Sequence, residues 1–384
     1  MNSGEVKLMS LPIGVTILAA SLASFVLARE PSGSADVSVP LGLPPLTESQ
    51  KANDKLVPLG KKLFFDRRLS FNNTNSCGMC HIEAQAFASN QSALAVGMEG
   101  KSLRRNAPSL YNVAYQKLLF HDGREPYLAD QVWSPLLSPI EMANPSVGYL
   151  VDRIRALKDY DGQFESAFGG QGPSMQTVGD AIAAYEKTLL SGNSRFDRWY
   201  YGGKSDELTK QEAAGFDLFS GKGGCSGCHT IGKTSALFTD QQFHVTGVGF
   251  HAATMPPPES WDVQLAPGVM TKVENSLLDP VSEPRMNDIG RFEITLNAAD
   301  RFAYKTPSLR NVALTHPYMH DGSIGSLEEV VDFYDRGGYP HDGKRELNPL
   351  HLTDEEKADL VAFLKTLTGD NVQQLVSQSA TPAD

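Results

Sequence analysis

Cysteine is scarce in this chain, and a surplus of positive charge is missing. Only four cysteines occur in 384 residues, too few for a fold built on disulfides. The formal net charge is -11 at pH 7, whereas nucleic-acid-binding proteins contact the phosphates with clustered Lys and Arg. We therefore expect no nucleic-acid partner. Hydrophobic residues make up 41% of the chain and charged residues 21%, which is typical of a globular protein rather than a disordered or fibrous one.

Long apolar runs are also rare, and the clearest one stands at the beginning of the chain. Residues 11–28 form an apolar stretch that follows Lys7. A membrane span needs about 20 residues, and this run is shorter. We therefore interpret residues 1–28 as a cleaved export signal rather than an anchor, and 29–45, rich in Pro, Gly and Ser, as a flexible linker. The mature protein is expected outside the cytoplasm, in the periplasm or at the cell surface.

Alternation typical of strands is scarce as well, whereas helix signals recur along the chain. The segment from Thr47 to Leu63 and the apolar stripe from Val178 to Leu189 are both predicted to be helical. The connections are long and rich in Gly and Pro, notably over 246–284. We expect a mostly α protein with long loops. Capping-box spacing marks three further helix starts, at Thr209 with Glu212, Ser326 with Glu329, and Thr353 with Glu356.

A short sequence repeat divides the chain. The sequence PSLYNVA at 108–114, followed by HDG at 121–123, recurs as PSLRNVA at 307–313, followed by HDG at 320–322. Each copy lies downstream of one Cys-x-x-Cys-His motif, so we interpret the chain as a duplicated unit. The predicted units are an N-terminal domain over 46–195, a C-terminal domain over 196–370 and a flexible tail over 371–384.

All four cysteines fall in two copies of the motif that attaches haem c, CGMCH at 77–81 and CSGCH at 225–229. Two thiols three residues apart can each bond one vinyl group of a single haem, and the adjacent His then lies beneath the iron as its ligand. A zinc site would not need the His directly after the second Cys, and a thioredoxin-like redox pair would not explain that His. The predicted haem-binding residues are Cys77, Cys80, His81, Cys225, Cys228 and His229.

Three other segments accompany the two motifs. They are FHDGR at 120–124, SPIEM at 138–142 and LRNVALT at 309–315. Together with the haem motifs, they resemble the bacterial dihaem cytochrome c peroxidases, including their MauG-like branch. The resemblance implies two cytochrome c-like α domains, each with one covalent haem c, and a calcium ion at their interface. It also implies that hydrogen peroxide is reduced at one haem while the other relays or stores electrons.

The resemblance also implies roles for single residues. His81 matches the proximal ligand of the haem that reacts with peroxide, and Glu141 matches the distal carboxylate of that pocket. A carboxyl group there can move a proton between the two peroxide oxygens, which breaking the O–O bond requires. Burial can raise the pKa of a glutamate enough for this role. Gln131 and Pro135 match other positions of the pocket lining. The residues that match the calcium site are Asn106, Thr315 and Pro317.

Two departures from the common peroxidase pattern favour the MauG-like branch. Peroxidases that need reductive activation carry a distal His after the first haem motif, and no His occurs here between His81 and His121. The first haem is therefore expected to be open, with Met98 as the alternative ligand. Tyr334 stands at the position of the Met that binds the other haem in most relatives, and a phenolate there would lower the potential of that haem. The rival ligands are His316, Met319 and His320.

A third departure concerns the residue before Asp-Gly-Arg. His121 replaces the Trp that usually serves as an electron bridge there, and an imidazole is harder to oxidise than an indole. His121 could still connect the haems by hydrogen bonding, or it could be structural, because His320 stands at the equivalent place in the second copy. Trp133 is the alternative relay.

The sequence therefore favours a dihaem peroxidase with MauG-like haem ligation. Its partners would be hydrogen peroxide and either an electron-donor protein, such as a small cytochrome or copper protein, or a partner protein oxidised at a residue such as Trp. A homodimer is a candidate assembly. The alternative is a non-catalytic dihaem electron-transfer cytochrome, in which both irons would be six-coordinate and Glu141 would have no catalytic role.

Overall fold

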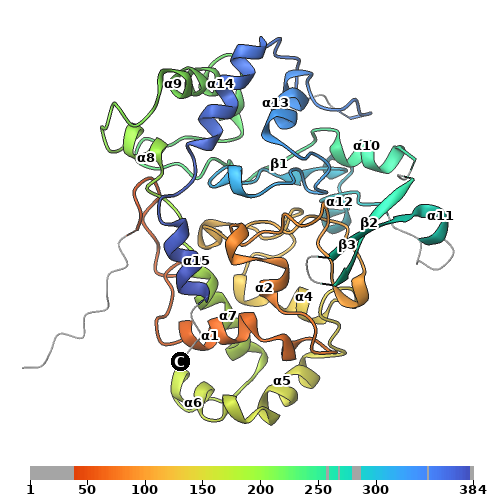
Figure 1. The fold of residues 1–384 in the computed structure, drawn as a ribbon. Coiled ribbons are helices and arrows are strands. Elements are labelled where there is room, and N and C mark those ends of the chain that lie inside the picture. The colour runs from red at the N-terminus through yellow and green to blue at the C-terminus, as the bar shows by residue number, and fades with distance from the viewer. Residues whose placement is uncertain (1–38, 257–258, 267–268, 279–286, 344–345, 381–384) are drawn as a thin grey trace, which may run out of the picture. The chain divides into compact units, whose positions relative to one another are not determined.

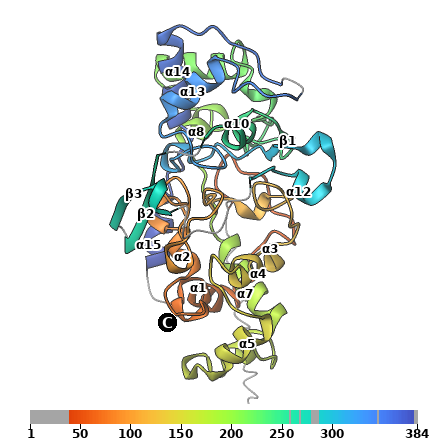
Figure 2. The same cartoon turned by 90° about the vertical axis from the view of Figure 1, so that its right-hand side faces the viewer.

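The computed structural model describes residues 39–256, 259–266, 269–278, 287–343 and 346–380, so the predicted export signal lies outside the described residues. Helices predominate over strands in the described part, as the sequence predicts (Figures 1 and 2). Among the described helices, none combines the length and apolar character that a membrane crossing requires. The helices are α1 (Val57–Phe65), α2 (Cys77–Cys80), α3 (Leu128–Gln131), α4 (Trp133–Leu137), α5 (Val147–Ala156), α6 (Gln163–Ala167), α7 (Met175–Lys187), α8 (Arg195–Tyr200), α9 (Lys210–Ser220), α10 (Val248–Thr254), α11 (Asn275–Leu278), α12 (Phe292–Thr295), α13 (Leu327–Asp335), α14 (Asp354–Lys365) and α15 (Val372–Ala380).

The strands form two small antiparallel sheets. β1 (Phe243–His244) pairs with β4 (Tyr304–Lys305), with His244 opposite Tyr304. β2 (Ser260–Ala266) and β3 (Val269–Glu274) form a hairpin. The β1–β4 pair connects two segments that are about 60 residues apart in the sequence.

The predicted capping boxes start three of the helices. In α9 the Oγ1 of Thr209 accepts a hydrogen bond from the Glu212 amide at 3.2 Å, and the Glu212 carboxylate accepts one from the Thr209 amide at 2.7 Å. α13 and α14 begin in the same way. Two more boxes, at Ser174 in α7 and Ser194 in α8, escaped prediction because Thr and Asp close them in place of Glu or Gln.

Three predictions of local structure are wrong. The first helix starts at Val57 rather than near Thr47, because a proline in its first turn favours that start. The segment 246–284 contains α10 and the β2–β3 hairpin and is not only loop. The predicted flexible tail is helical over Val372–Ala380, since Val372, Leu375 and Ser379 recur on one face and are buried.

The predicted flexible linker is ordered from residue 39 onward, and residues 29–38 lie outside the described part. Leu43 is buried and packs with Tyr115 and Leu190. The carbonyl oxygen of Gly42 accepts a hydrogen bond from the Arg310 guanidinium at 2.6 Å. One buried leucine and this charge-assisted hydrogen bond therefore fix a segment whose composition predicts flexibility.

Buried apolar side chains gather mainly in two clusters. The first surrounds α1 and α7, which pack together, and the second surrounds α9 and α14, which pack together as well. α15 is the exception, because Val372 and Leu375 belong to the first cluster although they follow the second in sequence (Figure 1). Contacts join the described residues from 39 onward into a single compact unit, so the division into two domains at residue 195 stays a prediction.

The sequence repeat is also a structural repeat. Asn112 and Asn311 both adopt the left-handed backbone conformation, with φ of 63° and 62°. Their amides donate to equivalent carbonyl oxygens, those of Leu189 and Leu367. Ser191 joins the two copies, because its backbone N–H donates to Oδ1 of Asn112 at 2.9 Å and its hydroxyl donates to Oδ1 of Asn311 at 3.0 Å.

Candidate haem sites

The first Cys-x-x-Cys-His motif forms a single helical turn. α2 spans the motif from Cys77 to Cys80, and residues three apart on a helix lie on the same face. Nδ1 of His81 donates a hydrogen bond to the carbonyl oxygen of Phe87 at 3.0 Å, since a carbonyl oxygen can only accept. Burial lowers the pKa of this imidazole. A neutral ring protonated at Nδ1 presents Nε2 to a metal.

The second motif repeats this arrangement. Cys225–Gly227 form a 3-10 turn, and Nδ1 of His229 donates to the carbonyl oxygen of Phe238 at 2.9 Å. Burial lowers the pKa of His229 too. The accepting carbonyl is nine residues from the histidine here and six residues away in the first motif. The two halves therefore orient their histidines with the same kind of bond, although the intervening loops differ in length.

Both motifs have the donor set that a covalently attached haem requires. Among the described residues, the four cysteines form no disulfide. Burial raises the pKa of Cys80 to about 12 and that of Cys225 to about 11, so both are thiols at neutral pH. Each motif thus offers two thiols next to an imidazole nitrogen held in the metal-binding tautomer. The residues present fit haem c at both places.

Glu141 lies beside the first motif. Its backbone N–H donates to the carbonyl oxygen of Ser138 at 3.0 Å in the turn that follows α4. Burial raises the pKa of its carboxyl group, although a hydrogen bond with Ser138 and the charge of Arg124 oppose the shift. After burial, the charge of Glu141 is the second cause that raises the pKa of Cys80. The structure therefore brings this partly buried carboxyl group close to the first cysteine pair.

The Met98 loop packs on the same region. The Met98 amide donates to the carbonyl oxygen of Ile140 at 3.0 Å, and Met98 is buried. A Cβ added to Gly97 would lie 2.0 Å from that carbonyl oxygen, so the close approach requires glycine. The Cys80 thiol lies 3.9 Å from the Val96 carbonyl oxygen in the same loop. Met98 therefore stays the alternative ligand of the first iron.

The other predicted pocket residues lie on the helices before Glu141. Gln131 ends α3, and Pro135 lies in α4, where its carbonyl oxygen accepts a hydrogen bond from the Met142 amide at 3.1 Å. This bond holds the Glu141 turn against α4. Trp133 is buried in the first cluster, and its Nε1 donates to the Met175 carbonyl oxygen at 3.2 Å. The lining role of Gln131 and Pro135 stays a prediction.

Tyr334 lies near the second motif, in α13. Burial raises the pKa of its phenol to about 12, and the charges of Cys225 and Cys228 add to the shift. These charges act on Tyr334 because the cysteine pair is close to it. A phenol with this pKa is neutral at pH 7 unless a cation stabilises its anion, and ferric iron is such a cation.

Two of the three rival ligands lie elsewhere. His316 is exposed, and the ring of His320 stacks on Tyr304 with 3.5 Å between ring centroids. Met319 packs with Tyr334 against one apolar cluster, which contains Val248 and Phe333. Met319 is therefore the rival that shares the surroundings of Tyr334.

Comparisons with known proteins agree with this geometry. A family model described as di-haem cytochrome c peroxidase matches residues 54–205. The methylamine utilization protein MauG of Methylorubrum extorquens is 36% identical over 318 residues, which cover 82% of this chain and 78% of that protein. The cytochrome-c peroxidase IdrP1 of Pseudomonas sp. (strain SCT) is 34% identical over 93% of this chain and 92% of its own length. The chain belongs to the dihaem cytochrome c peroxidase and MauG family.

Solved structures of this family have the same fold. The crystal structure of a MauG-like protein associated with microbial copper homeostasis matches with a TM-score of 0.70 and 30% identity, covering 91% of this chain and 98% of that one. The diheme peroxidase BthA from Burkholderia thailandensis matches with a TM-score of 0.65 and 26% identity, covering 86% of this chain and 95% of that one. This family member is therefore a mostly helical, haem-dependent peroxidase.

In this dihaem peroxidase, His121 lies where the two sequence halves meet. Its Nε2 donates to the backbone carbonyl oxygen of Asn106 at 3.0 Å, and the Asn106 amide donates to the carbonyl oxygen of His320 at 2.7 Å. The Lys305 amide donates to the His121 carbonyl oxygen at 2.8 Å. Burial lowers the pKa of His121 to about 4, so its ring is neutral at pH 7. The two equivalent histidines are thus linked through one asparagine, while an electron-transfer role of His121 stays a prediction.

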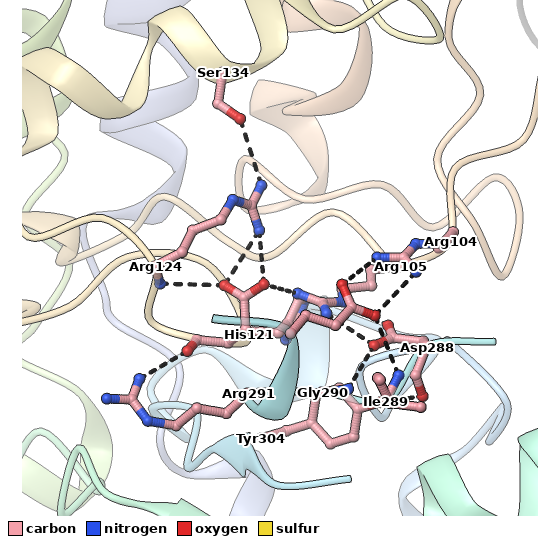
Figure 3. Close-up of polar contacts among 12 residues, drawn as sticks. Arg104, Arg105, His121, Arg124, Ser134, Asp288, Ile289, Gly290, Arg291 and Tyr304 are labelled. Atoms are coloured by element: carbon pink, nitrogen blue, oxygen red, sulfur yellow. Dashed lines mark hydrogen bonds and ion pairs between the residues drawn. The ribbon is translucent and has the colours of Figure 1, made fainter. Parts of the chain in front are cut away.

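An ion-pair network surrounds His121 and joins residues of both halves (Figure 3). Arg105 contacts Asp288 at 2.6 and 2.8 Å and Asp122 at 2.6 Å. Arg124 also contacts Asp122, at 3.0 Å. Burial alone raises the pKa of both aspartates, but the charge and hydrogen bonds of Arg105 hold each below its usual value of 3.8. Tyr304 donates to the carbonyl oxygen of Asp288 at 3.2 Å.

Of the predicted calcium residues, Asn106 lies at this junction. The Asn106 side chain donates from Nδ2 to the Ala93 carbonyl oxygen at 2.9 Å, and the Thr315 hydroxyl lies 3.3 Å from the Val312 carbonyl oxygen. Pro317 follows a cis peptide bond. A calcium ion held by these residues stays a prediction.

Sequence reasoning missed two charged residues near the first motif. Arg124 stacks on Phe120 at 3.3 Å, and its charge acts on Glu141. Glu186 in α7 is 4% exposed, burial raises its pKa to about 8, and within the described residues its Oε2 has no hydrogen-bond partner. Its position four residues after Ile182 on the buried stripe is the signal that could have predicted its burial.

Proposed function

We propose that this protein is a MauG-like dihaem c peroxidase that carries two covalent haems, one at His81 and one at His229. Peroxide would react at the first haem, and the second would store or relay the oxidising equivalents. The observation that supports this proposal is a difference between the surroundings of the two haem motifs. Both histidines have the same carbonyl bond, but the partly buried carboxyl group of Glu141 lies beside the first motif and the phenol of Tyr334 beside the second.

Haem c supplies an iron that binds peroxide and accepts its oxidising equivalents. The protein's part at the first site is proton transfer. Breaking the O–O bond requires a proton to move from one peroxide oxygen to the other. Glu141 is suited to accept and return this proton, because burial raises its pKa toward neutrality. Arg124 limits this rise, since its positive charge favours the carboxylate.

At the second site, Tyr334 would be the sixth ligand of the haem. An anionic oxygen ligand stabilises oxidised iron, whereas a Met ligand raises the potential. Such a haem is suited to holding oxidising equivalents rather than to easy reduction. The reductant would then be an electron-donor protein or a partner protein oxidised at a residue such as Trp. The similarity to MauG supports the second of these, and the similarity to the cytochrome-c peroxidases supports the first.

Three further parts of the proposal rest on the sequence. Residues 1–28 would direct export to the periplasm or cell surface, where haem c is attached. A calcium ion would bind at Asn106, Thr315 and Pro317. Two copies of the chain could form a homodimer.

The test is to add stoichiometric hydrogen peroxide to the fully ferric holoprotein, without prior reduction, and to record optical and EPR spectra over the first seconds. Immediate oxidation of both haems is expected if the first haem is open. A reaction that starts only after one haem is reduced would instead make Met98 a closing ligand. Two six-coordinate, unreactive haems would support the alternative, a non-catalytic electron carrier.

A further inference from the structure

A continuous set of contacting aromatic rings leads from the second haem motif to the protein surface. We name as the aromatic column the six residues Phe219, Phe238, Phe363, Phe196, Trp199 and Tyr200. Four of them are buried phenylalanines, and the last two lie at the end of α8. The whole set belongs to the second half of the chain.

The inner end of the aromatic column touches the iron-binding histidine. The ring of Phe219 lies 6.5 Å from the ring of His229, centroid to centroid. Phe238 provides a second contact, because its carbonyl oxygen accepts the hydrogen bond from Nδ1 of His229 at 2.9 Å. Phe219 and Phe238 are also neighbours, with 6.2 Å between their ring centroids. The column therefore begins at the ring that would hold the second iron.

The middle of the aromatic column is tightly packed. Phe196 lies 5.2 Å from Phe238 and 5.8 Å from Phe363, and Phe363 lies 5.1 Å from Phe219. All these rings are within the range of direct aromatic contact. Two routes of similar spacing therefore connect His229 with Phe196.

The outer end of the aromatic column carries oxidisable rings. Tyr200 stacks on Phe196 with centroids 5.2 Å apart and an interplanar angle of 15°, and it is 44% exposed. Trp199 is partly exposed and lies 5.9 Å from Tyr200 and 6.2 Å from Phe196. Phenol and indole rings give up an electron far more readily than phenylalanine rings, so these two residues are the ones on the column that can hold a radical.

The first half has no equivalent column among its described residues. The carbonyl of Phe87 binds His81, and the Phe87 ring contacts Phe64 and Tyr111. Tyr111 is 5% exposed, and Tyr185, the next tyrosine in contact with Phe64, is 4% exposed and bonded to a serine. The tyrosines that contact Phe87 and Phe64 are therefore enclosed, whereas the outer end of the aromatic column reaches solvent.

We propose that Trp199 and Tyr200 are the redox-active surface residues through which this peroxidase draws electrons from a protein partner. The inference rests on the proposed function, in which the second haem holds oxidising equivalents from peroxide. In this step one electron leaves the Tyr200 or Trp199 ring and passes along the aromatic column to the oxidised second haem. The ring proton goes to solvent water, which reaches Tyr200 directly. The partner protein then returns one electron, and solvent returns one proton, which restores the ring.

The test is radical mapping in the holoprotein without any donor protein. Stoichiometric peroxide is added in the presence of the spin trap 2-methyl-2-nitrosopropane, and the trapped residues are located by mass spectrometry. Adducts are expected on Tyr200 and Trp199, and they should be lost in the double variant Trp199→Phe, Tyr200→Phe. Phenylalanine keeps the ring packing, so haem content and the ferric spectrum should not change.

Tyr127→Phe and Tyr149→Phe are the matched controls. Both tyrosines are exposed, Tyr127 at 67% and Tyr149 at 41%, and both lie outside the aromatic column. Labelling by exposure alone would favour Tyr127 over Tyr200. Adducts on Tyr127 or Tyr149, with Tyr200 and Trp199 unlabelled, would overturn the inference while leaving the proposed function intact. Haem spectra that do not respond to peroxide would overturn the proposed function and the inference with it.

Discussion

The two halves of this peroxidase are built from the same parts but surround them differently. Each half fixes its histidine through a backbone carbonyl, and each places an asparagine with positive φ after the haem motif. Beyond the histidine they diverge. The first half places a carboxyl group near its motif and encloses the tyrosines that contact Phe64 and Phe87. The second half places a phenol near its motif and extends a set of contacting aromatic rings from its histidine to solvent.

This difference shows which features duplication preserved and which it left free to change. The bonds that orient a histidine are short-range and involve the backbone, so side-chain changes leave them intact. Glu141 and Tyr334 come from segments distant from the motifs, after α4 and on α13, so these two side chains can change independently. One scaffold can therefore hold two sites with different surroundings.

The largest expected effect is at the first site. Glu141→Gln should slow peroxide cleavage by about 10² to 10⁴-fold, because the amide cannot carry the proton. Stopped-flow rates measure this, with the exposed Glu165→Gln as the control. In the wild type, the rate should rise with pH as the carboxyl group ionises, and because its pKa is raised, this rise should lie above 4.5. Unaltered kinetics in the variant would remove Glu141 from the mechanism.

The second prediction concerns Tyr334 and the reduction potential of the second haem. Tyr334→Met should raise the reduction potential of the second haem by on the order of 0.1 V or more, because axial ligands set haem potentials over about 0.8 V. Spectroelectrochemical titration measures it, and the first haem serves as the internal control. An unchanged potential and spectrum would mean that Tyr334 does not bind the iron.

The third effect tests the junction between the halves. Arg105→Met leaves Asp122 and Asp288 without their shared cation, so we expect the free energy of unfolding to fall by about 3 to 5 kcal/mol. Urea denaturation measures it. The neighbouring Arg104→Met removes a more exposed ion pair with Glu293 and should cost less than about 1 kcal/mol. Equal losses in the two variants would contradict a special role for Arg105.

The same network predicts acid sensitivity. The folded pKa values of Asp122 and Asp288 are lowered, so their contribution to stability is complete above the unfolded value of about 3.9 and is lost as pH falls through the folded values. Arg105→Met should therefore show a smaller loss of stability between neutral pH and pH 3 than the wild type does.

The smallest expected effect is the difference in stability between variants of the two repeated asparagines. Asn112→Ala should cost about 3 kcal/mol, from left-handed backbone strain and the loss of two bonds to Ser191. Asn311→Ala also loses two bonds, from the Ser191 hydroxyl and the Gly369 amide. It should nevertheless cost less, about 2 kcal/mol, because it also removes a buried Nδ2 that has no partner within the described residues. Thermal unfolding of both variants measures the difference, and the corresponding Gly variants separate strain from bonding. The reverse order would contradict this account.

Local signals predicted much of this protein. Thr209, Ser326 and Thr353 start helices because a capping box involves residues only three apart. Each haem motif and each copy of the repeat consists of consecutive residues, so they can also be recognised from the sequence. The features that escaped prediction depend on distant partners. Glu186 is buried only because α7 packs against α1, and Arg105 meets Asp288 across 183 residues.

Composition predicted flexibility in two segments that a few contacts order instead. The Pro- and Gly-rich segment around Leu43 is held by one buried side chain and by hydrogen bonds to the backbone of Gly42 and Pro44. The polar C-terminal segment contains the apolar face of α15. The pocket residues were chosen through the family resemblance, since Glu141 has no sequence feature of its own that separates it from a surface glutamate.

The core of the first half depends on the C-terminal helix α15. Val372 and Leu375 of α15 complete the core of the half that is synthesised first, and domains generally fold as they emerge from the ribosome. Here the earliest core lacks two of its apolar side chains until residues 372–375 are made. A chain that ends at residue 370 should therefore leave its first half more open to protease than the chain that carries α15.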